Sequence, residues 1–147
     1  MIDDKDWKIL FQLMDNGRKS VVDISNDLGI PRATVQERIK KLVDEGIIKK
    51  FTIIPNYQKI GKEVTAYILV TFSRDSNLSQ KALAQEIAKI PEVYEISLIS
   101  GEWDIMLKVR ATSVHEIGNL VIERLRMMRG IEKTQTCVCF QTIKESP

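Results

Sequence analysis

Cysteine and histidine are scarce in this sequence, which has Cys137, Cys139 and His115 among its 147 residues. Two thiols one residue apart make a strained disulfide, and a structural zinc site needs about four such ligands. We therefore expect no disulfide and no resident metal, and we predict that both cysteines are small buried hydrophobes. His115 has no visible partner for acid–base or nucleophilic catalysis, so we predict no catalytic residues.

Long apolar runs are also missing, because no stretch approaches the roughly 20 residues that cross a membrane. Residues 1–4 are acidic, which does not fit the basic start of a secretion signal. The sequence has neither a glycine-rich loop that cradles phosphates nor a nucleophile elbow. We therefore expect a cytoplasmic protein with no membrane association, no enzymatic activity and no cofactor.

Positive charge is concentrated in one segment, although the net charge of the chain is only +2. Residues 32–50 hold six basic against three acidic side chains, whereas residues 1–31 hold four basic against six acidic ones. A local excess of positive charge is what a helix facing DNA needs. A solvated helix face gives the same pattern, so charge alone does not decide between the two.

Three short helices are predicted in the first 45 residues. Residues 3–14 carry apolar side chains at helical spacing and are expected to bury them: Trp7, Leu10, Phe11 and Met14. Ser20 and Gly29 fit the two ends of a second helix. A third helix, with Pro31 in its first turn, extends to about Glu45. Its apolar stripe is formed by Val35, Ile39, Leu42 and Val43.

The second and third helices, joined by a turn that contains glycine, are typical of a helix-turn-helix. Residues 47–54 follow as a predicted strand or tight hairpin, which would supply a wing. The major groove of DNA admits one helix, and an apolar back face would hold the third helix while its polar front meets the bases. The pattern by itself fits a generic three-helix bundle with a solvated third helix equally well.

The second half of the chain changes to short strands and helices. Residues 55–62 lack clear periodicity and are predicted to be a linker or hinge. The order that follows is β-α-β-β-α-β, typical of a ferredoxin-like fold, over residues 64–73, 79–90, 93–99, 105–110, 113–128 and 133–143. Two helices cover one face of such a sheet, so we expect a partner subunit to cover the other. The predicted fold class is α+β.

Six segments have a family resemblance when they are taken together: Asp-Trp-Lys-Ile-Leu (6–10), Asp-Ile-Ser-Asn-Asp-Leu-Gly-Ile (23–30), Thr-Val-Gln-Glu-Arg-Ile-Lys-Lys-Leu (34–42), Glu-Gly-Ile-Ile-Lys (45–49), Ser-Gly-Glu-Trp-Asp (100–104) and Thr-Gln-Thr (134–136). In this order and spacing they resemble the Lrp/AsnC family, the feast/famine regulatory proteins. The resemblance implies a winged helix-turn-helix DNA-binding domain over residues 1–54, the linker 55–62, and a ferredoxin-like effector-binding and oligomerisation domain over residues 63–147.

The predicted DNA contacts lie on the third helix: Arg32, Thr34, Gln36, Arg38, Lys40 and Lys41. Arginine, glutamine and threonine reach base edges or phosphates, and the two lysines contact phosphates or remain solvated charges. The alternative for each residue is solvent exposure without contact.

The resemblance also implies an effector site at an interface between C-terminal domains. Its predicted residues are Ser100, Gly101, Glu102, Trp103, Asp104, Thr134 and Thr136. By analogy, Asp104 pairs with the amino group of a ligand, backbone N–H groups of the turn take its carboxylate, and the two threonines face the same cleft. A turn favours Gly and Asp for backbone reasons alone, and Trp103 either lines the pocket or packs at a subunit interface.

The chain departs from the family pattern at three positions. Pro31 stands where serine is common at the start of the recognition helix, so a side-chain cap or phosphate contact is missing there. Trp103 stands where tyrosine or phenylalanine is common, which changes the pocket. Glu37 stands where a basic residue is frequent, so we do not predict that it contacts DNA.

These observations together predict a transcription regulator that binds double-stranded DNA in a sequence-specific manner. An amino acid would modulate its assembly or its DNA binding. Its partners would be DNA, the amino acid and further copies of the chain, as a homodimer that assembles into a tetramer or octamer. The alternative is a stand-alone amino-acid-binding or assembly protein that does not bind DNA.

Overall fold

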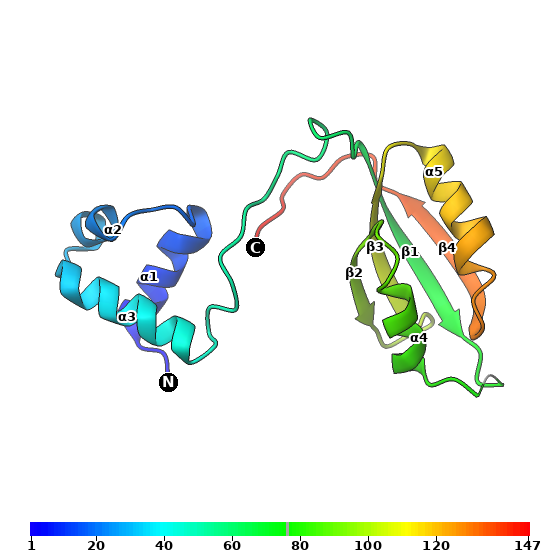
Figure 1. Ribbon diagram of the computed structural model, residues 1–147, viewed down its shortest axis with the longest axis horizontal. Coiled ribbons are helices and arrows are strands. Elements are labelled where there is room, and N and C mark those ends of the chain that lie inside the picture. The colour runs from blue at the N-terminus through cyan, green and yellow to red at the C-terminus, as the bar shows by residue number, and fades with distance from the viewer. Residues whose placement is uncertain (76) are drawn as a thin grey trace. The chain divides into compact units, whose positions relative to one another are not determined.

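The computed structural model describes residues 1–75 and 77–147. These residues form two compact units, Met1–Ile54 with Lys144–Pro147, and Pro55–Ile143. The first unit contains the helices α1 (Asp4–Asp15), α2 (Val21–Leu28) and α3 (Arg32–Asp44). The second unit contains β1 (Val64–Phe72), α4 (Gln80–Ile87), β2 (Val93–Leu98), β3 (Ile105–Ala111), α5 (Val114–Asn119), the π-helix η1 (Leu120–Leu125) and β4 (Ile131–Val138). Figure 1 labels its strands and α-helices.

Side-chain caps begin α1 and α2, and the cap of α2 is the predicted Ser20. Asp3 accepts a hydrogen bond from the N–H of Asp6 (2.9 Å), and the Asp6 carboxylate accepts one from the N–H of Asp3 (3.1 Å). This reciprocal capping box begins α1. Ser20 caps α2, which ends at Gly29 with a φ of 65° that glycine adopts without steric cost. Pro31 lies one position earlier than predicted, as the N-cap of α3 rather than inside its first turn.

Helix α1 contributes other side chains to the core of the first unit than the sequence predicts. The buried side chains are Ile9, Ile24, Ile30, Val35 and Leu42. The prediction that Trp7, Phe11 and Met14 are buried is wrong, because they are 48%, 59% and 46% exposed. The predicted apolar stripe of α1 overlaps a second stripe of side chains, which includes Asp6 and Ile9. Helices α2 and α3 pack against this second stripe. A charged residue in that stripe made it look polar in sequence. On α3, Val35 and Leu42 of the predicted stripe are buried and Ile39 is partly buried, whereas Val43 is exposed.

The predicted strand or hairpin over residues 47–54 is also wrong, because these residues form no strand in the described structure. Ile47 and Ile48 pack against the helical core, and the Ile48 N–H donates to the Leu42 carbonyl (2.9 Å). Phe51, Ile53 and Ile54 are exposed. A β-rich sequence becomes a strand only where a neighbouring strand supplies hydrogen-bonding partners, and none pairs with this segment.

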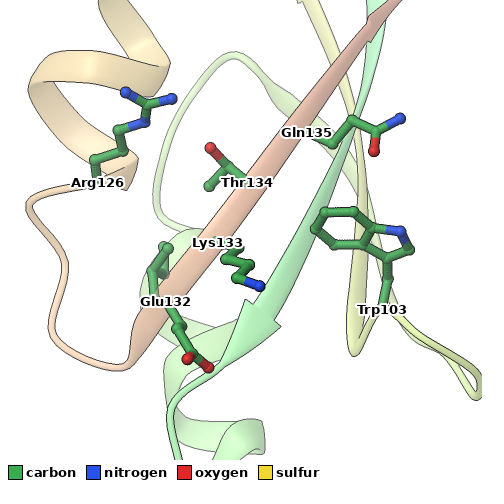
Figure 2. A pocket seen from close by; sticks show the side chains of 7 residues that line it. Trp103, Arg126, Glu132, Lys133, Thr134 and Gln135 are labelled. Carbon is green, nitrogen blue, oxygen red and sulfur yellow. The ribbon is translucent and has the colours of Figure 1, made fainter.

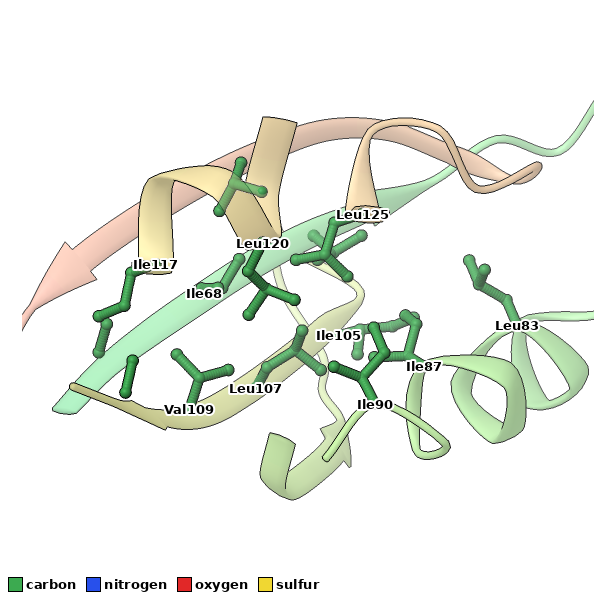
Figure 3. Close-up of a cluster of buried hydrophobic side chains, with 14 residues drawn as sticks. Ile68, Leu83, Ile87, Ile90, Ile105, Leu107, Val109, Ile117, Leu120 and Leu125 are labelled. Atoms are coloured by element: carbon green, nitrogen blue, oxygen red, sulfur yellow. The ribbon is translucent and has the colours of Figure 1, made fainter. Parts of the chain in front are cut away.

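The second unit confirms the β-α-β-β-α-β order. Its four strands form an antiparallel sheet in the order β2-β3-β1-β4. Alternate residues of β1 and β3, including Ile68, Val70 and Leu107, are buried against α4, α5 and η1, as Figure 3 shows. Several predicted bounds change: α4 ends at Ile87 rather than at residue 90, and β4 spans Ile131–Val138 rather than residues 133–143. The second helix continues from Asn119 as a π-helix.

No helix of the described residues covers the opposite face of the sheet. Tyr67, Leu69 and Met106 are half-buried on it. Cys137, opposite Tyr67, is exposed and Cys139 is only partly buried, so the prediction that both cysteines are buried is wrong. Cys137 lies on the edge strand β4, and Cys139 lies just beyond its end. Among the described residues, no helix packs on the face of β4 where Cys137 lies. No helix among the described residues is long and apolar enough to cross a membrane.

One end of the uncovered face is closed by an arginine between two tyrosines. Arg110 is buried, with its guanidinium 3.6 Å from the ring centroid of Tyr57 and 5.5 Å from that of Tyr94. The two rings meet edge to face at 5.6 Å. Tyr57 belongs to the segment 55–62, so part of the predicted linker packs on the sheet.

Candidate nucleic-acid interface and effector site

The outward face of α3 presents only some of the six predicted DNA contacts. Arg32, Gln36 and Lys40 are exposed and follow one another at intervals of four, so they lie along one side of the helix. Lys40 forms a surface ion pair with Asp44 (2.6 Å). Thr34 is half-buried. This side combines two cations with an amide that can read base edges.

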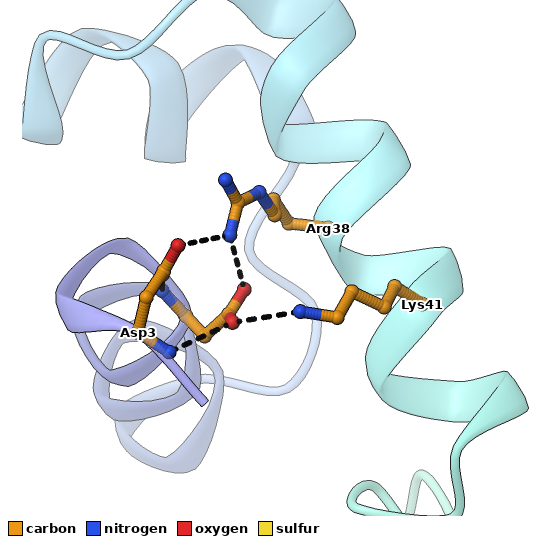
Figure 4. Close-up of polar contacts among 4 residues, drawn as sticks. Asp3, Arg38 and Lys41 are labelled. Atoms are coloured by element: carbon orange, nitrogen blue, oxygen red, sulfur yellow. Dashed lines mark hydrogen bonds and ion pairs between the residues drawn. The ribbon is translucent and has the colours of Figure 1, made fainter. Parts of the chain in front are cut away.

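Arg38 and Lys41 point instead toward α1, as Figure 4 shows. Arg38 contacts the Asp3 carboxylate and lies 3.3 Å from that of Asp6, and the Lys41 ammonium lies 3.2 Å from the Asp6 carboxylate. The two basic side chains are 26% and 34% exposed, whereas the Asp6 side chain is 0% exposed. We call these four residues the α1–α3 lock. The structure therefore brings two of the predicted DNA contacts to a helix–helix junction.

Electrostatics explains how the lock tolerates a buried carboxylate. Burial raises the pKa of Asp6, but hydrogen bonds from the Asp3 N–H, Lys41 and Arg38 more than offset this effect, so the net shift is downward. The Asp6 N–H and the Arg38 side chain lower the pKa of Asp3 to about 2. Both carboxylates are ionised at neutral pH, and they hold the inner side of α3 while its outer side stays free.

The lock had a signal in the sequence that pattern analysis missed. Asp3 and Asp6 are three residues apart, as are Arg38 and Lys41, so each pair shares one helix face. The spacings and the charges are complementary. The sequence alone does not tell which faces of two helices meet. That packing makes Lys41 an ion-pair partner of α1 and leaves Lys40 exposed.

The turn before β3 is held in place by hydrogen bonds of Asp104 to β1 and α4. Gly101 has a φ of 107°, a conformation that side-chain-bearing residues rarely adopt. The Asp104 carboxylate accepts a hydrogen bond from the Phe72 N–H (2.8 Å), and its carbonyl accepts one from Gln80 (3.0 Å). Asp104 therefore joins the turn to the end of β1 and to α4. The side chain expected to take a ligand amino group already has this structural role.

An open hollow of about 630 Å³ lies beside the turn, along β4. It is lined by Trp103, Arg126, Ile131, Glu132, Lys133, Thr134 and Gln135. Two predicted effector residues, Trp103 and Thr134, line it, but Ser100, Gly101, Glu102, Asp104 and Thr136 do not. Ser100, Gly101, Glu102 and Thr136 are exposed. Figure 2 shows Thr134 turned toward Arg126 on one side of β4, with Gln135 and Trp103 on the other side.

Five lining residues were missed from the sequence: Arg126, Ile131, Glu132, Lys133 and Gln135. Four of them lie beside Thr134 on β4, and Ile131 and Glu132 precede the predicted start of that strand at residue 133. Because β4 is an edge strand, residues of both its faces border the hollow, so alternation along the strand does not tell lining from non-lining residues. Arg126 had no signal, because it lies just beyond the π-helix.

Comparison with known proteins agrees with this architecture. The profile described as a winged helix-turn-helix DNA-binding domain matches residues 2–49, and that of the Lrp/AsnC ligand binding domain matches residues 65–147. An uncharacterized HTH-type transcriptional regulator of Pyrococcus horikoshii is 50% identical over 145 residues, which cover 99% of this chain and 97% of the relative. The proline dehydrogenase transcriptional activator of Rhizobium radiobacter is 33% identical over 99% of this chain and 94% of its own length.

Solved structures show the same fold. A transcriptional regulator of Neisseria meningitidis, determined as a complex with L-Met, superposes with a TM-score of 0.93 at 25% identity, over 99% of this chain and 94% of that one. AsnC of E. coli superposes with a TM-score of 0.83 at 24% identity, over 99% and 96% of the two chains. The two matched profiles together cover most of the sequence in the predicted order. The chain belongs to the Lrp/AsnC family of transcriptional regulators.

Proposed function

We propose that this regulator binds DNA through the outward side of α3 and that an amino acid sets its assembly or its DNA affinity. The observation that carries the proposal is that the two sides of α3 have different surroundings. Arg38 and Lys41 are held by α1, while Arg32, Gln36 and Lys40 remain exposed on the other side. A helix fixed from behind presents its front at a defined angle, as entry into a major groove requires.

The proposed working unit is at least a dimer. Tyr67, Leu69 and Met106 lie on the face of the sheet that no helix covers, and a second copy of the chain would bury them. A two-fold dimer places two recognition helices on successive major grooves, about 34 Å apart or a multiple of that distance. The operator should therefore be pseudo-palindromic. Dimers would assemble further into tetramers or octamers.

The proposed effector is an amino acid, which the L-Met complex of the Neisseria meningitidis regulator supports. A ligand shifts assembly or DNA binding only through its different affinities for the two states. We propose that the protein needs no cofactor, catalyses no reaction and works in the cytoplasm, where the DNA of a prokaryote lies.

Gel-shift titration with the DNA upstream of its own gene tests the DNA-binding proposal. Arg32→Ala should weaken binding to every duplex, whereas Gln36→Ala should mainly reduce the preference for the operator over mismatched DNA. Arg129→Ala, an exposed change in the other unit, is the control and should bind as the parent does. If no duplex binds at any salt concentration, the protein is a stand-alone amino-acid-binding or assembly protein.

The switch is tested separately by light scattering and gel shifts with and without each amino acid. Binding should change the assembly size or the DNA affinity. An amino acid that binds but leaves size, shape and DNA affinity unchanged contradicts the switch.

A further inference from the structure

The charges around the hollow beside β4 define the kind of effector it accepts. Arg126 and Lys133 are its two cations and Glu132 is its one anion. Among the described residues, neither cationic side chain forms an ion pair within the chain. An acidic amino acid carries the opposite set, two carboxylates and one ammonium group. A neutral amino acid leaves one of the two cations without a counter-charge.

The positions of these groups favour an elongated ligand. Thr134 turns toward Arg126 on one side of β4, while Trp103 and Gln135 lie on the other side (Figure 2). The hollow therefore passes around an edge strand, with a cation and a hydrogen-bonding side chain toward the Arg126 end. A ligand with an anionic group at each end fits this arrangement, and the Trp103 ring supplies an apolar wall for the methylene groups between them.

The π-helix gives an independent reason to single out Arg126. The Arg126 N–H donates to the Val121 carbonyl at 3.0 Å, five residues back rather than four. A wider turn changes the direction of the residue that follows it, and π-helical turns occur frequently at functional sites. Here the residue that follows is the one that lines the hollow.

We propose that the effector of this regulator is an acidic amino acid, L-aspartate or L-glutamate, bound in the hollow with its carboxylates at Arg126 and Lys133 and its ammonium group at Glu132. This inference rests on the proposed regulation by an amino acid. It differs from the expectation drawn from family resemblance, in which Asp104 takes the amino group, because Asp104 is bonded to β1 and does not line the hollow.

Calorimetric titration of the full chain with L-glutamate, L-aspartate, L-methionine and glutarate tests the proposal. The two acidic amino acids should bind most tightly. Arg126→Met and Lys133→Met should each weaken them about tenfold or more, since each removes a hydrogen bond between charged groups. L-methionine has one carboxylate, so at most one of the two substitutions should weaken it. Glu132→Gln should weaken L-glutamate but strengthen glutarate, which lacks the ammonium group.

Arg129→Met is the matched control, because Arg129 is exposed and does not line the hollow. It should bind L-glutamate as the parent does, and melting without ligand should show that all variants fold. The inference is overturned if L-glutamate and L-aspartate bind no better than L-methionine, or if Arg126→Met and Lys133→Met leave their affinity unchanged. Tight binding of neutral amino acids alone would leave the proposed function standing. Absence of binding by any amino acid would overturn both this inference and the proposed regulation by an amino acid, and would leave the DNA-binding proposal to its own test.

Discussion

Two adjacent lysines of α3 should respond in opposite ways to the same substitution. Lys41→Met removes one of the two cations on the Asp6 carboxylate, which has 0% exposure, and keeps the length of the side chain. Breaking a lone buried ion pair costs about 3–5 kcal/mol. Arg38 and the Asp3 N–H remain bonded to Asp6 here, so we expect a loss nearer to the 1–3 kcal/mol of one unsatisfied buried acceptor, about 2 kcal/mol.

Lys40→Met is the matched control, because Lys40 is exposed and pairs only with Asp44 on the surface. Its stability should change by less than about 0.5 kcal/mol. Its DNA binding should weaken, and the slope of log K against log salt should fall by about 0.9 for each phosphate that the protein no longer neutralises. Lys41→Met should leave that slope unchanged, since its ammonium group faces α1.

Urea unfolding followed by tryptophan fluorescence measures the stability of the first unit. A Trp103→Phe background leaves Trp7, on α1, as the reporter. Gel shifts at several salt concentrations give the slopes. The lock is refuted if Lys41→Met unfolds at the same urea concentration as the parent while lowering the salt slope as much as Lys40→Met does.

Three further outcomes are expected. The folded-state pKa of Asp3 is about 2 against an ordinary 3.8, so the stabilisation it contributes should be complete above about pH 4 and lost as the pH falls toward 2, and Asp3→Asn should flatten this dependence in Trp7-detected unfolding. Gly101→Ala should destabilise the second unit by about 1 kcal/mol or more, measured by Trp103 fluorescence, because alanine is strained at a φ of 107°; an unchanged stability would mean that the turn relaxes. Asp104→Ala should cost about 1–3 kcal/mol by leaving the Phe72 N–H without its acceptor, while Asp104→Asn, which keeps a carbonyl oxygen there, should cost less.

Local signals in the sequence were sufficient to predict the secondary structure wherever a helix or strand is stabilised by neighbouring residues or by packing within its own unit. Ser20 and Gly29 marked the two ends of α2 because capping depends on neighbouring residues only. The alternation in β1 and β3 was recovered because one face of each strand meets helices from the same unit. The segment 47–54 has comparable β-propensity but no strand beside it, and it forms no strand.

For the candidate sites too, features set by neighbouring residues could be predicted from the sequence, and features set by distant contacts could not. The turn at Gly101 was recognisable because it depends on short-range spacing. The helix-turn-helix was recognisable through family resemblance, since its spacing fits a generic three-helix bundle equally well. The role of Arg38, and the presence of Arg126 in the hollow with Trp103, depend on which distant surfaces come together. Side chains that are equivalent in sequence, such as Lys40 and Lys41, differ in function because one helix face meets α1 and the other meets solvent.

By itself, therefore, the sequence determined the order of the elements, the two ends of α2 and the division into a helical half and a β-α-β-β-α-β half, because these follow from interactions between residues close in the chain. The choice of a helix-turn-helix over a generic three-helix bundle came from family resemblance. Only the tertiary structure decided which stripe of α1 is buried, which cations of α3 remain free, and which charges line the hollow beside β4. Those outcomes depend on the relative rotation of packed helices and strands, and a single sequence carries no local record of that rotation.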